Sequence, residues 1–249
     1  MITLDTLVKT ILIIVVFGFI AILIIKRFLY FQPTYEFMYP QAKFEDIVEG
    51  GIHAWFLPNP TTNKVVLFCH GNGGNVSHRQ DKVIALNKLG YSVLIFDYRG
   101  YGQSKGVPTE ENCYQNASMF CELLIKRHGG KENVILYGES LGAAVASYIA
   151  LKYAIPVLVI ESGLPSISAL LSSKVKALGA LGFIFYEFNT VSYLKNYRGK
   201  TMVLHCRNDE IISWESTEEM RSLATKVIEI SGSHNNPDIP WDEIKTFIG

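Results

Sequence analysis

The stretch NVILYGESLGAAVA, residues 133–146, holds the strongest structural signal in this sequence. NVILY is a short apolar run that predicts a buried strand, and the alanine-rich continuation predicts a helix. Between them GESLG, residues 138–142, matches G-x-S-x-G, the pattern of a sharp strand-to-helix turn that presents a serine hydroxyl at the end of a sheet. The alternative is a serine in an ordinary turn, but a strand before and a helix after favour Ser140 as a nucleophile.

Apolar runs and helical patterns alternate on both sides of this stretch. Continuous apolar strands separated by helices indicate a parallel sheet covered on both faces. We therefore predict a three-layer α/β domain over residues 46–249. The expected helices cover Ser77–Leu89 and Glu110–Arg127, and the other expected strands are Ile52–Leu57, Val65–Cys69, Ser92–Asp97, Val157–Ile160, Met202–His205 and Lys226–Ile230.

The composition excludes several classes of protein. The 249 residues carry 23 Lys and Arg against 23 Asp and Glu, so the chain lacks the basic excess of a nucleic-acid binder. Hydrophobic residues make up 49% and charged residues 18%, which argues against a disordered acidic segment. The four cysteines show no C-x-x-C spacing, and no metal-binding motif is present, so we expect neither a disulfide scaffold nor a metal.

The N-terminus predicts a membrane anchor over residues 1–31, followed by a linker over residues 32–45. Ile11–Ile25 contains fifteen residues without a polar side chain. At about 1.5 Å per residue this run covers only about 23 Å of a hydrocarbon core of roughly 30 Å, and flanking Lys9, Lys26 and Arg27 would snorkel to the interfaces. A cleaved signal peptide is disfavoured because no small-residue cleavage site follows. A buried core helix is the third alternative.

The charges around this segment predict its orientation. Lys26, Arg27 and Lys43 follow the apolar run, whereas Lys9 and Asp5 precede it. The positive-inside rule then places the large domain of a single-pass membrane protein in the cytoplasm. Cysteines without an evident pairing pattern agree with a reducing compartment. A translocated domain behind a basic N-terminus remains the alternative.

The segment 164–200 interrupts the alternation of strands and helices. It reads as two or more short apolar helices inserted between successive strands. These helices can simply cover the core, form a small cap over the site, or make a surface that touches lipid. An apolar cap would suggest an acyl-binding pocket.

A serine nucleophile needs a base and an acid that orients it. Of the histidines after Ser140, His205 lies inside an apolar strand and is interpreted as structural, whereas His234 lies in a loop before the last helix. Asp209, at the end of a strand and 25 residues before His234, is the predicted acid. Glu210 and Glu161 are the possible substitutes, and a turn aspartate is the structural alternative for Asp209.

Backbone N–H groups must stabilise the oxyanion of such a reaction. We predict one from Leu141 and a second from Asn72 in the loop HGNGGN, residues 70–75, with Gly73 as the fallback. The loop lacks the G-K-[ST] ending of a phosphate-binding loop. His70 is interpreted as a scaffold for this loop, and DYRGYGQS, residues 97–104, as a motif that holds neighbouring loops by hydrogen bonds.

Five motifs in order, HGNGGN, DYRGYGQS, GESLGAAVA, RNDE and GSHNN, resemble the α/β-hydrolase superfamily, and more closely its small membrane-anchored members. The likeness runs from about Ile52 to the C-terminus. It implies an eight-stranded type of hydrolase core, serine esterase chemistry and no cofactor, to which the segment 164–200 would add a short helical cap. Carried onto this chain, it makes Ser140 the nucleophile, Asp209 the acid and His234 the base. Ala143 departs from the usual second glycine after the elbow.

Together these observations predict a serine hydrolase of the esterase, lipase or thioesterase type, which cleaves acyl ester or thioester bonds through an acyl-enzyme. The group that this chain resembles includes acyl-protein thioesterases and lipid hydrolases. The resemblance therefore implies a small or lipid-like acyl substrate, with the membrane as partner. A serine peptidase with the same triad and a catalytically silent, membrane-tethered binding module are the alternatives. The natural substrate and the oligomeric state do not follow from the sequence.

Overall fold

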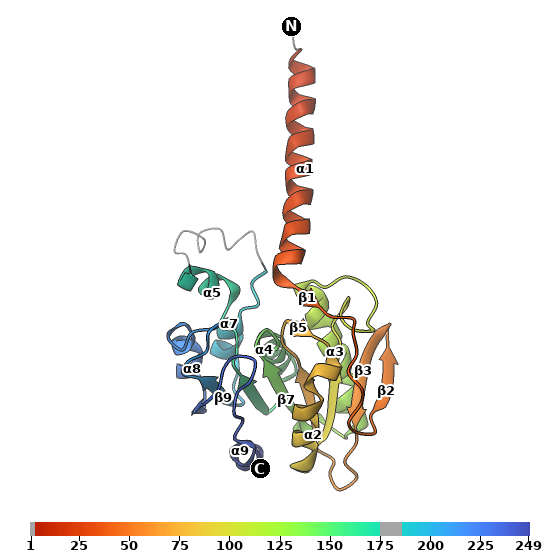
Figure 1. The fold of residues 1–249 in the computed structure, drawn as a ribbon, viewed down its shortest axis with the longest axis vertical. Helices are drawn as coiled ribbons and strands as arrows, with labels where there is room; N and C mark the ends of the chain where they lie inside the picture. The colour runs from red at the N-terminus through yellow and green to blue at the C-terminus, as the bar shows by residue number, and fades with distance from the viewer. Residues whose placement is uncertain (1–2, 175–185) are drawn as a thin grey trace.

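A computed structural model describes residues 3–174 and 186–249, and it describes no side chains at positions 4, 7, 22–30 and 171–174. Within these limits the chain forms an eight-stranded sheet in the order β10-β9-β8-β7-β4-β6-β3-β2 (Figure 1). β3 runs antiparallel to β2 and β6, and the other pairs are parallel. The strands are β2 (Glu45–Glu49), β3 (Ile52–Leu57), β4 (Val65–Cys69), β6 (Ser92–Phe96), β7 (Val134–Glu139), β8 (Val157–Glu161), β9 (Lys200–Cys206) and β10 (Lys226–Ile230).

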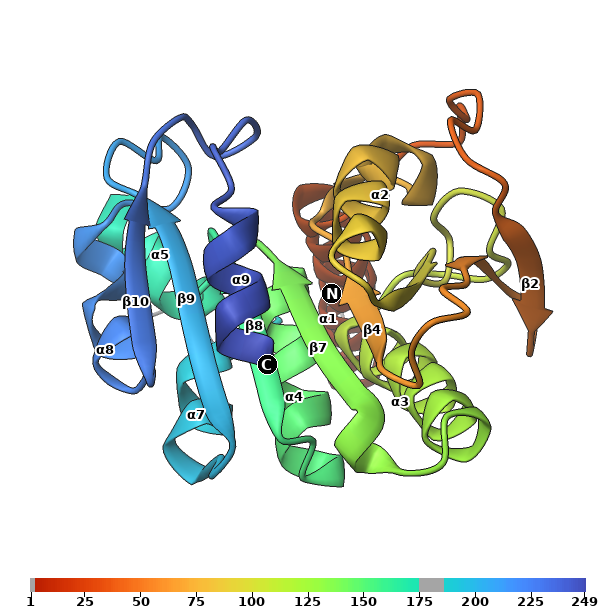
Figure 2. The same ribbon diagram turned by 90° about the horizontal axis from the view of Figure 1, so that it is seen from below.

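Helices cover both faces of the sheet, which confirms the three-layer α/β prediction. α2 (Gln80–Lys88) and α9 (Trp241–Ile248) lie on one face of the sheet (Figure 2), and their apolar side chains are buried in the core on that face. The opposite core takes side chains from α3 (Glu110–Arg127), α4 (Gly142–Tyr153), α7 (Thr190–Asn196) and α8 (Glu218–Ser222). The central strands β4, β6, β7 and β8 are buried along their whole length, as their continuous apolar runs predict.

Most expected elements agree with the observed ones to within three residues. α3 and the strands β3, β4 and β10 have the predicted bounds. The expected helix Ser77–Leu89 instead begins as a 3₁₀ turn, Val76–Arg79, because the Asn75 side chain caps that turn before α2 starts. β2 was not predicted: its sequence EDIVE is charged, and it lies mostly exposed at the edge of the sheet.

The expected linker, residues 32–45, is in fact packed against the domain. β1 (Gln32–Pro33) pairs in parallel with β5 (Gly73–Gly74), inside the glycine-rich loop. The Asn75 side chain donates to the carbonyl oxygens of Thr34 and Glu36 at 3.0 and 2.7 Å. Phe31 is buried, with its ring against those of Tyr101 and Phe188. The segment that follows α1 is therefore packed against the glycine-rich loop at 70–75.

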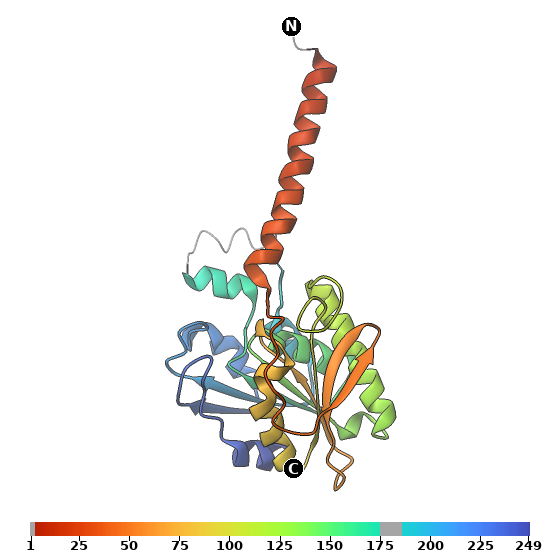
Figure 3. The same cartoon turned by 45° about the vertical axis from the view of Figure 1, so that its right-hand side comes forward.

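α1 (Leu4–Tyr30) extends away from the domain (Figure 3), and its apolar side chains from Val8 to Ile20 are largely exposed. Among the residues that the structure describes, no helix has a stretch long and apolar enough to cross a bilayer. This finding contradicts the predicted single-pass membrane localisation and leaves the N-terminal anchor unsupported. The uninterrupted apolar run is short for a span, at about 23 Å against roughly 30 Å.

The insert at 164–200 contributes α5 (Ile167–Lys174) and α7. Val191 and Leu194 of α7 are buried against α4, so this part of the insert covers the core. The rest of the predicted cap, residues 175–185, lies outside the described residues.

Candidate active site

The predicted site residues come together at one edge of the sheet, where the parallel strands have their carboxyl ends. The loop at 70–75 follows β4, Ser140 follows β7, Asp209 lies three residues after β9, and His234 lies four residues after β10. Open α/β sheets bind ligands at this edge because the loops that leave the carboxyl ends of the strands gather there.

Ser140 occupies a strained turn between β7 and α4. Its φ is +53°, in the left-handed region that a residue with a side chain adopts only when its surroundings impose it. The two flanking glycines explain how the turn fits. A Cβ at Gly138 would lie 2.6 Å from the Gly142 carbonyl oxygen, and one at Gly142 would lie 2.0 Å from that of Cys69. The G-x-S-x-G spacing is therefore required by backbone crowding around the serine.

Ser140, His234 and Asp209 form a continuous chain of hydrogen bonds. His234 Nε2 lies 3.0 Å from Ser140 Oγ, and His234 Nδ1 lies 2.8 Å from Asp209 Oδ2. Because a carboxylate only accepts, the ring proton is on Nδ1, which leaves Nε2 free to accept from the serine hydroxyl. The arrangement can move a proton from Ser140 to the imidazole.

Asp209 is held by three donors. Besides the imidazole, the backbone N–H groups of Ile211 and Ile212 donate to its Oδ1 at 2.9 and 2.7 Å. Burial by itself raises the pKa of the Asp209 carboxyl, but the hydrogen bonds from His234 and Ile212 outweigh it and lower that pKa below the ordinary value. Asp209 therefore carries a negative charge at neutral pH.

The alternative acids, Glu210 and Glu161, and the alternative base, His205, form hydrogen bonds with other groups. Glu210 accepts the backbone N–H of His234 at 3.1 Å, and Glu161 lies next to Lys82 and Tyr137. His205 is buried, and its Nε2–H donates to the Ile212 carbonyl at 2.8 Å, which steadies the loop that carries Asp209. Burial lowers the pKa of His205, consistent with a neutral structural ring.

Of the two predicted oxyanion donors, Leu141 directly follows Ser140 and Asn72 lines the same cavity as Ser140. Among the described residues, neither the Leu141 nor the Asn72 backbone N–H donates to another protein group. The Asn72 side chain is fixed by the Tyr101 hydroxyl, which donates to its Oδ1 at 2.8 Å. The Gly71 N–H is occupied, since it donates to Glu139 Oε2 at 3.3 Å.

Hydrogen bonds of two buried residues, His70 and Asp97, hold the loop at 70–75 and the turn after it in place. The His70 Nδ1–H donates to the Gly71 carbonyl at 2.7 Å, and burial followed by the charge of Arg79 lowers the pKa of His70 to about 4, so the ring is neutral. Asp97, in DYRGYGQS, accepts the Val76 N–H at 2.9 Å and lies 3.0 Å from the ring of His53. That motif holds neighbouring loops, as its sequence suggests.

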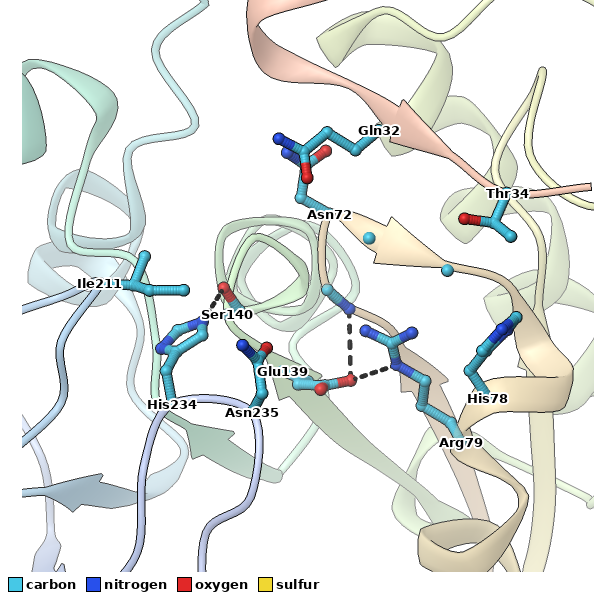
Figure 4. Close-up of a pocket in the computed structure, with 13 residues that line it drawn as sticks. Gln32, Thr34, Asn72, His78, Arg79, Glu139, Ser140, Ile211, His234 and Asn235 are labelled. Atoms are coloured by element: carbon cyan, nitrogen blue, oxygen red, sulfur yellow. Dashed lines mark hydrogen bonds and ion pairs between the residues drawn. The ribbon is translucent and has the colours of Figure 1, made fainter.

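A cavity of about 450 Å³ opens beside Ser140 (Figure 4). Ile211 contributes the one apolar side chain among the 13 lining residues, which contrasts with the acyl pocket that the apolar insert suggests. The lining residues are Gln32, Thr34, Gly71, Asn72, Gly73, Gly74, His78, Arg79, Glu139, Ser140, Ile211, His234 and Asn235.

Sequence reasoning missed a buried ionic cluster at the wall of this cavity. Glu139, the residue before the nucleophile, accepts from Arg79 Nε at 2.9 Å and from Lys82 Nζ at 3.2 Å. Lys82 also donates to Glu161 at 2.5 Å, and the Tyr137 hydroxyl donates to the same carboxylate. The charged Glu139 inside the elbow motif was the one signal in the sequence that could have indicated this cluster. Across residues 3–174 and 186–249, no group of three or more His, Cys, Asp or Glu side chains is arranged to hold a metal.

Sequence comparisons find related chains. A family model described as serine aminopeptidase S33 matches residues 60–180, which include Ser140. The uncharacterized protein R595 of Acanthamoeba polyphaga mimivirus is 29% identical, over 91% of this chain and 92% of its own. The mouse α/β-hydrolase domain-containing protein 17C is 25% identical, over 71% of this chain and 56% of its own.

Structural comparison agrees with these matches at the level of the fold. The Pyrococcus furiosus esterase Pf2001 superposes with a TM-score of 0.67 and 20% identity, over 88% of this chain and 95% of the esterase. The sheet, the strained elbow and the related sequences all identify the same group of proteins. The chain is a member of the α/β-hydrolase superfamily.

Proposed function

We propose that this protein is a serine hydrolase that cleaves carboxylic ester or thioester bonds through an acyl-enzyme. The observation that carries the proposal is the hydrogen-bonded chain from Ser140 Oγ through His234 to Asp209. Fold alone does not define an activity, but this chain of groups is the machinery that activates a serine hydroxyl. The structural neighbour from Pyrococcus furiosus is an esterase, which agrees with ester chemistry.

In the first half-reaction, Ser140 Oγ attacks the acyl carbonyl while His234 Nε2 takes the hydroxyl proton. The ionised Asp209 stabilises the imidazolium that forms and holds its ring in place. His234 then returns the proton to the leaving alcohol or thiol, and the acyl group remains on Ser140.

The Leu141 and Asn72 N–H groups would stabilise the negative oxygen of the tetrahedral intermediate. Because their positions are set by the elbow and by the braced loop, little reorganisation is needed during the reaction. In the second half-reaction, water attacks the acyl-enzyme with His234 again as base, and the free acid leaves.

A serine peptidase is the second candidate, favoured by the aminopeptidase family model. An aminopeptidase site needs an unpaired carboxylate for the free amine of its substrate. Among the 13 lining residues the one acidic side chain is Glu139, which already pairs with Arg79 and Lys82. Ester or thioester hydrolysis therefore fits this cavity better.

Labelling with a fluorophosphonate probe tests the proposal. We expect labelling of the wild type, none in Ser140→Ala, and much slower labelling in His234→Ala and Asp209→Asn. Ser222→Ala, an exposed serine on α8, is the matched control and should label normally. An unlabelled, folded wild type, or labelling that survives Ser140→Ala, would favour a silent binding module or another nucleophile.

A further inference from the structure

We propose that the cavity beside Ser140 binds an anionic group in the acyl part of the substrate, a carboxylate or a phosphate, through the free edge of the Arg79 guanidinium. The inference rests on the proposed serine hydrolase and narrows its substrate to esters or thioesters of acids that carry a second, negatively charged group.

Arg79 presents two nitrogen atoms without a protein acceptor to the cavity. Its Nε donates to Glu139 Oε2 at 2.9 Å, which fixes the plane of the guanidinium. Among the described residues, no group accepts from Nη1 or Nη2, although the side chain is only 14% exposed. A guanidinium with one free edge is suited to bind a carboxylate or a phosphate with two parallel hydrogen bonds.

The glycines of the loop make room for this group. A Cβ at Gly74 would lie 2.3 Å from Nη1, and Gly74 also has a φ of +82°. A Cβ at Gly71 would lie 3.3 Å from Nη2. Glycine at these positions therefore lets the guanidinium lie directly beneath the loop that carries the Asn72 N–H.

The guanidinium is close to the reacting serine. The same point, a Cβ at Gly71, would lie 3.4 Å from the Cβ of Ser140. A substrate that places its carbonyl carbon at Ser140 Oγ and its anionic group on Arg79 therefore has only a few bonds between these two groups.

The position of His234 indicates which part of the substrate carries the charge. His234 must face the leaving group to return its proton, and Arg79 lies on the other side of Ser140 (Figure 4). The acyl part, directed away from His234, is the part that reaches Arg79. A half-ester or half-thioester of a short dicarboxylic acid has the required arrangement.

The rest of the cavity is compatible with an anion. Glu139 is already shared by Arg79 and Lys82, and the other lining side chains bring amides, two hydroxyls, imidazoles and the single apolar Ile211. Polar groups in a pocket set orientation and specificity, and a site built around a charged partner rejects a neutral isostere.

The test uses N-acetylcysteamine thioesters of glutaric acid, of its neutral monoamide and of 4-phosphonobutanoic acid, with thiol release as the signal. For the wild type we expect kcat/KM to be about tenfold to a hundredfold higher for the glutaryl than for the amide substrate, the range of a charge-assisted hydrogen bond. In Arg79→Gln the ratio should fall to about one, because the cation is lost. Arg79→Lys, which keeps the charge without the fork, should be intermediate.

The ratio of two substrates on one variant does not depend on the fraction of folded enzyme. Arg198→Gln, which removes an exposed arginine next to the amino end of β9, is the matched control and should keep the wild-type ratio. A higher kcat/KM for the phosphono than for the glutaryl substrate identifies a phosphate group, and the reverse identifies a carboxylate. A wild-type ratio near one, or a ratio that survives Arg79→Gln, overturns the inference.

A binding assay covers the case in which none of these thioesters turns over. Glutarate, but not the uncharged diamide glutaramide, should protect Ser140 from fluorophosphonate in the wild type and not in Arg79→Gln. Absence of this protection together with absence of turnover also overturns the inference. Hydrolysis that persists in Ser140→Ala would instead reject the proposed function, so the two failures are distinguishable.

Discussion

Asp209 and Glu139 are both carboxylates at the carboxyl edge of the sheet, but different donors surround them. Asp209 accepts from a neutral imidazole and two backbone N–H groups, whereas Glu139 accepts from two cations and the Gly71 N–H. The proposed reaction changes the charge of His234, and a carboxylate with no cation of its own responds most strongly to that change. Glu139 is neutralised already and can only hold structure. Partners, more than burial, distinguish an orienting acid from a scaffold.

Replacing Asp209 should produce the largest effect. In Asp209→Asn the imidazole loses its acceptor and can adopt the wrong tautomer, so we expect kcat to fall by about 10⁴-fold, as for a triad aspartate. Steady-state kinetics on a neutral thioester measures this. Glu210→Gln is the matched control, since within the described part of the chain the Glu210 side chain accepts a hydrogen bond only from the backbone N–H of His234, and it should lose less than about tenfold, the effect of one modest hydrogen bond. Equal losses in both variants would show that Asp209 is not the orienting acid.

Replacing Glu139 should have an intermediate effect. Glu139→Gln removes the charge that faces Arg79 and Lys82 and weakens the bond to the Gly71 N–H, so the loop that carries Asn72 becomes less well placed. We expect kcat to fall by about 10- to 100-fold, less than for a lost oxyanion donor, because the Asn72 N–H remains present. A fall in kcat with an unchanged pH profile identifies a positioning role, while a shifted profile would mean that Glu139 takes part in proton transfer.

Asn75 connects the N-terminal segment to the same loop and contrasts with Asn189, whose side chain, among the residues that the structure describes, is hydrogen-bonded only to its own helix α7. Asn75 caps a 3₁₀ turn and donates to two carbonyl oxygens of the 34–36 segment. Asn75→Ala should lower the free energy of unfolding by about 2 to 3 kcal/mol, since it loses a cap and leaves buried carbonyls unpaired. Asn189→Ala should lose only about 1 kcal/mol, for its cap alone. Urea unfolding measures both, and equal losses would mean that the segment is not held through Asn75.

The parts of the site that the sequence predicted have signals that are local in the chain. The elbow needs only residues 138–142, and Asp209 and His234 each follow a strand whose apolar pattern is recognisable. Since parallel strands bring their carboxyl ends to one edge, their meeting follows from the fold.

What the sequence did not predict depends on contacts between distant positions. Arg79 and Glu139 are 60 residues apart, and Gln32 pairs with Gly73 through backbone groups that carry no residue-specific signal. The polar cavity was missed for the same reason, because its lining comes from five separate stretches of the chain. The N-terminal apolar run did predict a helix, but a count of apolar residues did not establish a span.

The smallest expected effect is on stability at acid pH, and it again separates the two carboxylates. Burial raises the pKa of both carboxyls. At Glu139, Arg79 and Lys82 outweigh it and hold the pKa well below its usual range, whereas at Asp209 hydrogen bonds from His234 and Ile212 and the charge of His234 lower the pKa. A carboxyl with a lowered pKa in the folded state stabilises the fold above its unfolded pKa, about 4, and this contribution is lost as the pH falls through the folded value.

The stability lost in Asp209→Asn should therefore shrink as the pH falls below about 4, and that lost in Glu139→Gln should persist to lower pH. Urea unfolding of both variants and the wild type between pH 7 and pH 3 measures the two differences. If the stability lost in Glu139→Gln instead shrinks at the same pH as that lost in Asp209→Asn, the Glu139 carboxylate is not held by the two cations. The contrast between an orienting acid and a neutralised scaffold would then have to rest on the kinetics alone.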